Sequence, residues 1–321
     1  MMEHPKDNPA YYRISAHYRW ALEQLFDVEQ APRVILLEDD MELAPDFFEY
    51  MAAMAALMDS DDSLWCASSW NDNGQSRFVS DERSLARSDF FPGLGWMLTA
   101  STWAELAPAW PLGFWDDWMR LGATRRGRQC VRPEVCRTYN FGEHGASKGQ
   151  FYAQYLRDIR LATDFVPWTQ RNLTHLHARP YAAALAAAVG GARVAASARD
   201  PLLQAGDGDT GSGGDVVLAY ASQREFDAAA ATLGIFREWK DGVPRAAYAG
   251  VVTVRLHGGA THVFLAPAEY LAAAQKQHRR GKKAAPKRRG AKKLAAAAEE
   301  TSGGRTTLRR ARAGDAADDA G

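Results

Sequence analysis

Among the residues that could do chemistry, a run of three carboxylates stands out first. Glu38, Asp39 and Asp40, called the acid trio below, directly follow an apolar run. Adjacent carboxylates repel one another, and a bound cation keeps all of them ionised at little cost, so one interpretation is a metal site. The alternative is that the aspartates cap the next helix, which we expect Pro45 and Asp46 to open. Spacing alone leaves both interpretations open.

A second pair of acids, Asp116 and Asp117, lies between Trp115 and Trp118 in the segment FWDDWMR. Desolvation by indole rings would raise the pKa of a carboxylate toward the range useful for a general base. The alternative is an amphipathic helix whose tryptophans pack inward while the acids face water. The pattern by itself favours this second interpretation.

The elements that must position these acids can be predicted from hydrophobic periodicity. Residues 33–37 read as a strand buried on both faces, which places the acid trio at the carboxyl edge of a sheet, where open α/β sheets bind ligands. Three- and four-residue apolar steps predict helices over 9–26 and 45–58, and residues 63–70 form another short strand. This alternation predicts parallel strands.

Two glycine-containing segments are candidates for ligand contact. In residues 90–98, Gly93 and Gly95 permit close approach of a ligand or of neighbouring backbone, although the segment lacks the GxGxxG spacing of dinucleotide sites. Residues 137–151 have the composition of a mobile flap that ends at a helix N-terminus, a natural phosphate site. A plain surface loop would have the same composition.

Composition changes along the 321 residues. Residues 176–269 predict a small α+β unit with a flexible insertion at 204–215, and residues 270–321 predict a disordered, basic and Ala-rich tail. Ten Lys or Arg and no acids lie within residues 276–293, which leaves 29 bases against 39 acids elsewhere. The basic run has no interleaved aromatics, so we expect a solvated tail and no nucleic-acid partner.

Two features bound the cellular context. As written, the sequence contains no apolar window of about 18 residues and no signal peptide, so we expect neither a membrane anchor nor a leader in it. Three cysteines are too few for a disulfide scaffold and lack zinc-finger spacing. One bridge with one thiol left over would require an oxidising compartment.

Several segments together resemble one family, the Golgi N-acetylglucosaminyltransferase I group, and are similar to the protein O-mannose N-acetylglucosaminyltransferases as well. The resemblance covers most of residues 11–175 and 215–267, and includes LLEDDMELAPDFFEY, SLWCASSWNDNG, DFFPGLGWMLTASTWAEL, FWDDWMR and FGEHGASKGQF. It implies an α/β, Rossmann-like GT-A nucleotide-sugar transferase fold that lacks its first strands. Residues 1–175 would be the partial GT-A catalytic domain and residues 176–269 the small C-terminal unit.

The resemblance also implies roles for the two acidic clusters. Asp40 would be the direct protein ligand of Mn²⁺, the implied cofactor, which bridges the UDP diphosphate. Asp39 would lie by the ribose and a metal-bound water, and Glu38 would bind hydroxyls of the transferred GlcNAc. Asp116 would be the general base, with Trp115 packed against the donor sugar.

Further positions match the same family. Leu94 would shape the sugar pocket, Ser147 would belong to the flap that orders over UDP-GlcNAc, and His17 aligns with the uracil contact. Cys66 and Cys130 match a family disulfide, which leaves the third cysteine as a free, structural thiol.

The implied reaction is a single inverting displacement. GlcNAc passes from UDP-GlcNAc to the 2-hydroxyl of the α-1,3-linked mannose of a high-mannose N-glycan, on the lumenal side of the Golgi membrane. Relatives have an N-terminal membrane anchor and further strands before the first helix, whereas only about ten residues precede it here. One alternative is an O-linked mannose acceptor, which the FWDDW and FGEHGASKGQF sequences disfavour. The other, prompted by the missing strands, is an inactive fragment.

Overall fold

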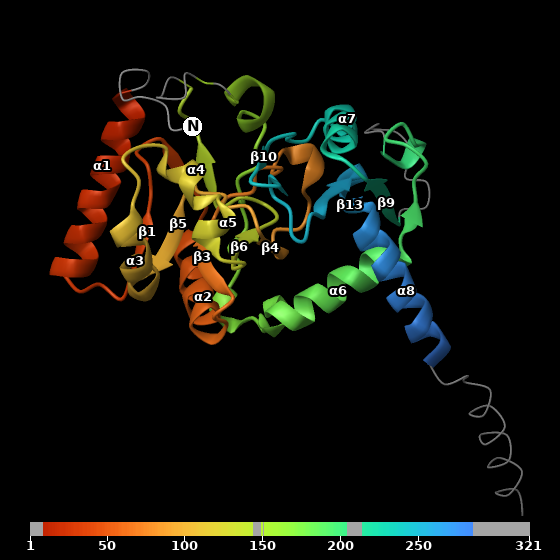
Figure 1. Cartoon of the computed structure of the whole chain (residues 1–321), viewed down its shortest axis with the longest axis horizontal. Helices are drawn as coiled ribbons and strands as arrows, with labels where there is room; N and C mark the ends of the chain where they lie inside the picture. Colours follow the sequence, from red (N-terminus) through yellow and green to blue (C-terminus); the bar gives the residue numbers. More distant parts are fainter. Residues whose placement is uncertain (1–8, 144–148, 150, 204–213, 285–321) are drawn as a thin grey trace, which may run out of the picture. The chain divides into compact units, whose positions relative to one another are not determined.

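The computed structural model describes residues 9–143, 149, 151–203 and 214–284 (Figure 1). The chain divides into two compact units, Met1–His278 and Arg279–Gly321. Both sheets and all of the candidate site residues described below lie in the first unit.

A five-stranded mixed sheet forms the first half of this unit. Its strands are ordered β1 (Arg33–Leu36), β5 (Trp96–Thr99), β3 (Leu64–Ser68), β6 (Gln129–Pro133) and β4 (Leu85–Ser88). Neighbours β3 and β6 run parallel, and the other neighbouring pairs run antiparallel. The predicted α/β class is confirmed.

The prediction for the first strand was wrong in two respects. Within the described residues β1 pairs only with β5, and only Val34 in it is fully buried. In addition, β5 lies between β1 and β3 and runs antiparallel to both, so these two strands point the same way without pairing. The chain reverses just before β5 through left-handed backbone at Gly93, Leu94 and Gly95, with φ of 70°, 48° and 83°.

Helices cover both faces of this sheet, as Figure 1 shows. On one face α2 (Phe47–Ser60) packs its apolar side on residues of β3, β5 and β6. On the other lie α1 (Pro9–Glu23), α3 (Ala100–Leu106) and α4 (Trp115–Met119), in a cluster rich in tryptophan. The tryptophans near Asp116 therefore belong largely to the core.

A second, four-stranded sheet is ordered β12 (Val252–Leu256), β13 (Thr261–Pro267), β9 (Asp215–Tyr220) and β8 (Arg193–Val194). Alternate residues of β9 face opposite sides: Val216 and Leu218 pack with α7 (Gln223–Leu233), and Val217 packs with α6 (Ala178–Gly191) and α8 (Ala268–Ala284). These strands, α6 and α7 belong to the same Met1–His278 unit as the first sheet.

The predicted disordered tail is wrong for residues 270–284, which form most of α8. Leu271 and Ala274 lie one turn apart and pack against Leu185 and Val189 of α6, so this part of the helix has an apolar face despite its many charges. No helix in the described part of the chain is long and apolar enough to span a bilayer. Residues 285–321 and most of the insertion at 204–215 lie outside the described residues.

Smaller elements complete the fold. Two short antiparallel pairs are β2 (Met41–Leu43) with β7 (Thr138–Asn140), and β10 (Trp239–Lys240) with β11 (Val243–Pro244), and α5 is Gly122–Arg125. Short helical turns are Gln24–Val28, Ser76–Phe78, Ala107–Ala109, Tyr152–Leu156, Trp168–Gln170, Thr174–Leu176, Pro201–Leu203 and His257–Gly259.

Candidate active site

The acid trio lies in the connection between β1 and β2. Helix α2 begins only at Phe47 and is preceded by Asp46 at its N-cap position, so the alternative that Asp39 and Asp40 cap this helix is wrong. Asp46 itself is fully buried, where it pairs with Arg137 and accepts a hydrogen bond from Trp168 at 2.6 Å. The trio is thus left facing the surface instead of being used in helix capping.

Strand β7 fixes the position of Asp40. The register pairs Met41 with Asn140, and the Asn140 Nδ2 donates to Asp40 Oδ1 at 2.9 Å. The Phe141 backbone N–H donates to the Asp40 carbonyl at 2.9 Å. Gly142 follows so closely that a Cβ there would lie 1.9 Å from Asp40 Oδ2, so glycine is needed at this position.

Helix α1 holds Glu38 through Tyr18. The Tyr18 hydroxyl donates to Glu38 Oε1 at 3.0 Å, and its ring stacks on Trp115 with centroids 4.4 Å apart. Trp115 is buried and also stacks on Trp96 and Trp110 at 5.7 and 6.0 Å. Tyr18 therefore connects the acid trio to the residue that precedes Asp116.

Helix α4 presents Asp116 and Asp117. It follows Phe114, whose φ of 53° turns the chain sharply into this five-residue helix. Arg120, four residues after Asp116, places its Nη1 2.8 Å from Asp116 Oδ2 and 3.0 Å from Asp117 Oδ1. The Asp116 side chain is 36% exposed, so it is not enclosed between the two indoles as the desolvation argument assumed.

The negative charge of Asp116 reaches Glu38 and Tyr18. Desolvation by the surrounding protein raises the pKa of Glu38, and the negative charges of Asp40, Asp116 and Asp39 raise it further. The hydrogen bond from the Tyr18 hydroxyl lowers this pKa and offsets part of the rise. Burial also raises the pKa of Tyr18, with contributions from the charges of Glu38, Asp116 and Asp40. Asp116 therefore lies within electrostatic range of the acid trio.

The other predicted ligand residues have different surroundings. His17 is exposed on α1 and stacks on Trp20, with ring centroids 5.7 Å apart. Leu94 has left-handed backbone, and its carbonyl accepts a hydrogen bond from Thr138 Oγ1 at 2.9 Å, which ties this turn to β7 beside Asp40. Ser147 lies outside the described residues.

The cysteines pair as the resemblance implied. Cys66 on β3 and Cys130 on β6 are register partners on neighbouring parallel strands and form a disulfide. Cys136 is free and buried, and burial raises the pKa of its thiol to about 12. Its sulfur accepts the Asn71 backbone N–H at 3.1 Å, which is a structural role.

Comparison with known proteins identifies the family of the chain. A family model described as the GNT-I family matches residues 2–278. The chain belongs to the GNT-I family. It is 53% identical over 254 residues to an alpha-1,3-mannosyl-glycoprotein 2-beta-N-acetylglucosaminyltransferase of Arabidopsis thaliana. The match covers 79% of this chain and 56% of that protein, so this GNT-I family chain spans about half the length of the relative.

Several residues that build the site of this GNT-I family chain were missed by sequence reasoning. Arg120 had a usable signal, because a cation four residues after Asp116 on a helix faces it. Tyr18, Asn140 and Lys240 had none. Each reaches the acids from a distant part of the chain, and Lys240 Nζ lies 2.8 Å from Asp117 Oδ2.

The residues present fit a divalent cation held by few protein ligands. Asp40 offers carboxylate oxygens, the donor type that Mn²⁺ accepts, and Gly142 leaves space beside Oδ2 that any side chain would fill. Within the described ranges, no group of three or more His, Cys, Asp or Glu side chains could hold a metal ion together. Asp40 would therefore supply one ligand, with the others coming from a nucleotide diphosphate and water.

Proposed function

We propose that this chain carries the centre for inverting transfer of GlcNAc from UDP-GlcNAc to the 2-hydroxyl of an α-1,3-linked mannose on a high-mannose N-glycan. The observation that supports it is that Asp116 lies within electrostatic range of Glu38 and Tyr18, which hydrogen-bond to each other and link the acid trio to Trp115. One carboxylate can activate an alcohol while the others face a sugar nucleotide. Family membership and the name of the plant relative give the sugar and the acceptor class.

Asp116 is the general base in this proposal. Arg120 holds its Oδ2 at 2.8 Å, and Oδ1 has no hydrogen-bond donor in the described part of the chain. Oδ1 can therefore accept the proton of the acceptor 2-hydroxyl as that oxygen attacks the anomeric carbon from the face opposite UDP. A single displacement inverts the configuration and needs no sugar bound covalently to the protein.

The acid trio and its supports form the donor side. Asp40, oriented by Asn140, would hold Mn²⁺, and the bound metal would supply positive charge that offsets the charge developing on the leaving UDP. Glu38 would accept hydrogen bonds from GlcNAc hydroxyls, with Tyr18 fixing its position. Asp39 would lie near the ribose.

Two features of the chain support a secretory compartment, and we place the protein on the lumenal side of the Golgi membrane. The Cys66–Cys130 disulfide persists in oxidising compartments. Asn172 begins an Asn-Leu-Thr glycosylation sequon and is exposed. The family is one of glycosyltransferases that act on glycoproteins in this pathway.

The test is Asp116→Asn in the 321-residue chain. Loss of the base should lower transfer of radiolabelled GlcNAc to a mannose-terminated N-glycan by about 10²-fold or more. The rise in Tm caused by UDP with Mn²⁺ should stay as in the wild type, because the donor side is intact. As a matched control, Asp40→Asn should abolish that rise.

Three results would change the assignment. Undiminished transfer by Asp116→Asn would remove its role as base. A preference for a mannosyl peptide over the N-glycan would assign an O-linked acceptor. No response of the wild-type chain to UDP and Mn²⁺ would show that these residues alone do not form a donor site.

A further inference from the structure

Arg120 serves two carboxylates through one nitrogen. Its Nη1 lies 2.8 Å from Asp116 Oδ2 and 3.0 Å from Asp117 Oδ1. The guanidinium cannot follow either acid freely, because its side chain is only 8% exposed, its Nε donates to the Phe91 carbonyl at 3.3 Å, and its plane lies over the Phe90 ring. One fixed cation therefore has to balance two adjacent negative charges.

A second cation reaches Asp117 from the C-terminal part of the same unit. Lys240 Nζ on β10 lies 2.8 Å from Asp117 Oδ2, the oxygen that Arg120 does not contact, and 3.9 Å from Glu238 Oε1. Partial burial of Asp117 pushes its pKa up, but the hydrogen bond and charge of Lys240 and the charge of Arg120 outweigh this and lower the pKa. Asp117 is thereby kept ionised between two cations.

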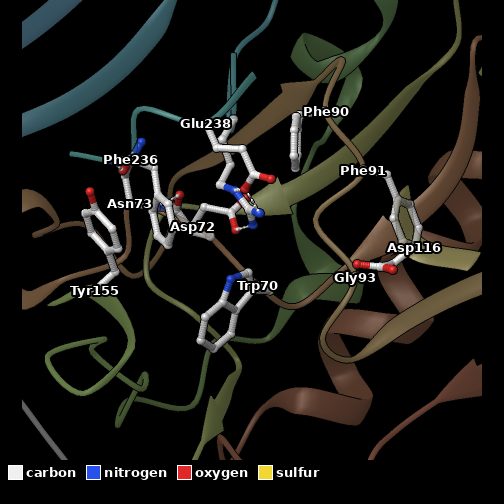
Figure 2. A network of polar contacts seen from close by, with 12 residues as sticks. Trp70, Asp72, Asn73, Phe90, Phe91, Gly93, Asp116, Tyr155, Phe236 and Glu238 are labelled. Carbon is white, nitrogen blue, oxygen red and sulfur yellow. Dashed lines mark hydrogen bonds and ion pairs between the residues drawn. The ribbon is translucent and has the colours of Figure 1, made fainter. Parts of the chain in front are cut away.

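The short strand that carries Lys240 is anchored on both sides. Before and after it, Glu238 and Arg245 pair with each other, and Arg245 Nη1 also reaches the buried Asp72 at 2.7 Å. In Figure 2, Asp72 and Glu238 lie within this network, and Asp116 lies beside Phe91 and Gly93. Asp241, next to Lys240, accepts the Gly122 backbone N–H at 2.7 Å at the start of α5. Lys240 is thus held beside α4 by the fold.

We propose that Lys240 is a positioning residue for Asp116: by neutralising Asp117 it leaves the shared Arg120 nitrogen to hold Asp116 as an ionised base. This rests on the proposed role of Asp116. Without Lys240, the unbalanced charge of Asp117 would compete for Arg120 and repel the charge of Asp116. Protonation of the base would then begin at higher pH.

Other charged or titratable groups also face this pair and must be considered. They come from α1, from the connection after β1, and from α4 and β10 themselves: Tyr11, Tyr18, Glu38, Arg120 and Lys240. The tyrosines are neutral at physiological pH, as unperturbed phenols also are, and burial raises their pKa further. Lys240 and Arg120 are the cations of the set. Arg120 contacts both acids whereas Lys240 contacts only Asp117, so removing Lys240 takes one positive charge from Asp117 without removing the partner of Asp116.

The experiment measures the acidic limb of the pH–kcat profile in the 321-residue chain for Lys240→Met, Asp117→Asn and the double variant. We expect Lys240→Met to move the limb up by about half a pH unit, the size expected for a partly exposed ion pair. In the Asp117→Asn background the same lysine substitution should move it far less, because Lys240 acts through Asp117. The KM for UDP-GlcNAc should not change.

Two control variants separate charge from structure. Lys240→Arg keeps the charge and should restore the wild-type limb, whereas Arg237→Met removes an exposed cation three residues away that has no ion pair among the described residues and should leave the limb in place. Equal Tm values across the set would show that each variant is folded. A uniform loss of kcat without a moved limb would indicate a merely structural lysine and overturn the proposal.

A readout without catalysis separates this proposal from the proposed function. Selective ¹³C labelling of aspartate carboxyls, assigned with the Asp116 and Asp117 variants, follows both titrations by NMR whether or not sugar is transferred. A higher midpoint of Asp117 with a moved midpoint of Asp116 in Lys240→Met supports the proposal. Unmoved midpoints overturn it even if the chain transfers GlcNAc.

Discussion

At the scale of single residues, Tyr18 shows how a site depends on side chains that do no chemistry. Its ring packs on Trp115 while its hydroxyl donates to Glu38, so one side chain sets the relation between the donor side and the residue before the base. Burial and then the nearby carboxylates raise the pKa of Tyr18, which keeps the phenol protonated and able to donate. In sequence it was only one apolar position of a helix.

The charged form of Glu38 is destabilised in the folded protein by desolvation and by the neighbouring carboxylates. Glu38→Gln removes this charge and should therefore stabilise the fold. The folded state raises the pKa of Glu38, so wild-type stability falls as the pH rises through that value. Glutamine is neutral throughout and still accepts from Tyr18. We expect a Tm about 2 °C higher at pH 7 in metal-free buffer, a small gain because the side chain is partly exposed.

The pH dependence checks the cause. Below about pH 4 Glu38 is protonated in both states, so the advantage of Glu38→Gln should vanish there. Glu42→Gln, an exposed acid on β2, serves as the control and should show no such difference. A gain that persists unchanged at low pH would rule out the electrostatic explanation.

At the scale of elements, the pairing of β2 with β7 converts a loop of acids into an ordered site. The pairing brings Asn140 to Asp40 and lets the Phe141 N–H bind the Asp40 carbonyl. The same pairing forces Gly142 against the Asp40 carboxylate. The position of the proposed metal ligand is therefore a property of a two-strand contact.

Gly142→Ala should damage ligand binding more than folding. Its Cβ would lie 1.9 Å from Asp40 Oδ2, so the carboxylate must turn away, and we expect at least about a tenfold weaker response to Mn²⁺ and UDP. Thermal shift titration measures this, and the Tm without ligand should change little because the position is at the surface. Gly281→Ala in α8, where a Cβ meets nothing within 4 Å, is the control. An unaltered titration would mean that Asp40 does not bind the metal.

The same contacts show what sequence could predict. Apolar runs and helical spacing predicted α2 and β3, because these elements are buried in ways that local periodicity reports. Sequence could not predict that β1 lies at the sheet edge, that β5 lies between β1 and β3, or how far α8 extends. Each of these depends on packing against segments far away in the chain. For the site, the acids were visible locally. Asn140, which binds Asp40, and Lys240, which binds Asp117, lie 100 and 123 residues further along the chain and were not.

At the scale of the whole Met1–His278 unit, the two sheets are joined by buried charge. Arg245 pairs with Asp72 and Glu238, and its guanidinium lies between the rings of Phe90 and Phe236 at 4.9 and 4.8 Å (Figure 2). The Asp89 backbone N–H also donates to the Ala247 carbonyl, and the Arg132 Nη2 donates to the Ala246 carbonyl. The segment around β10 and β11 is thus fixed to the half of the unit that carries the first sheet.

Arg245→Met should destabilise the unit strongly. It leaves the carboxylate of Asp72, which is 1% exposed, without its cation, and such a broken buried pair costs about 3–5 kcal/mol, equivalent to a fall in Tm on the order of 10 °C. Because most of this cost is the stranded charge, Asp72→Asn added to Arg245→Met should recover a substantial part of it. Arg19→Met, which breaks an exposed pair on α1, should change the Tm by only about one degree. If the double variant did not recover stability, Arg245 would act mainly through its packing on Phe90 and Phe236. Apolar contacts, and not the ion pair, would then hold the two sheets together.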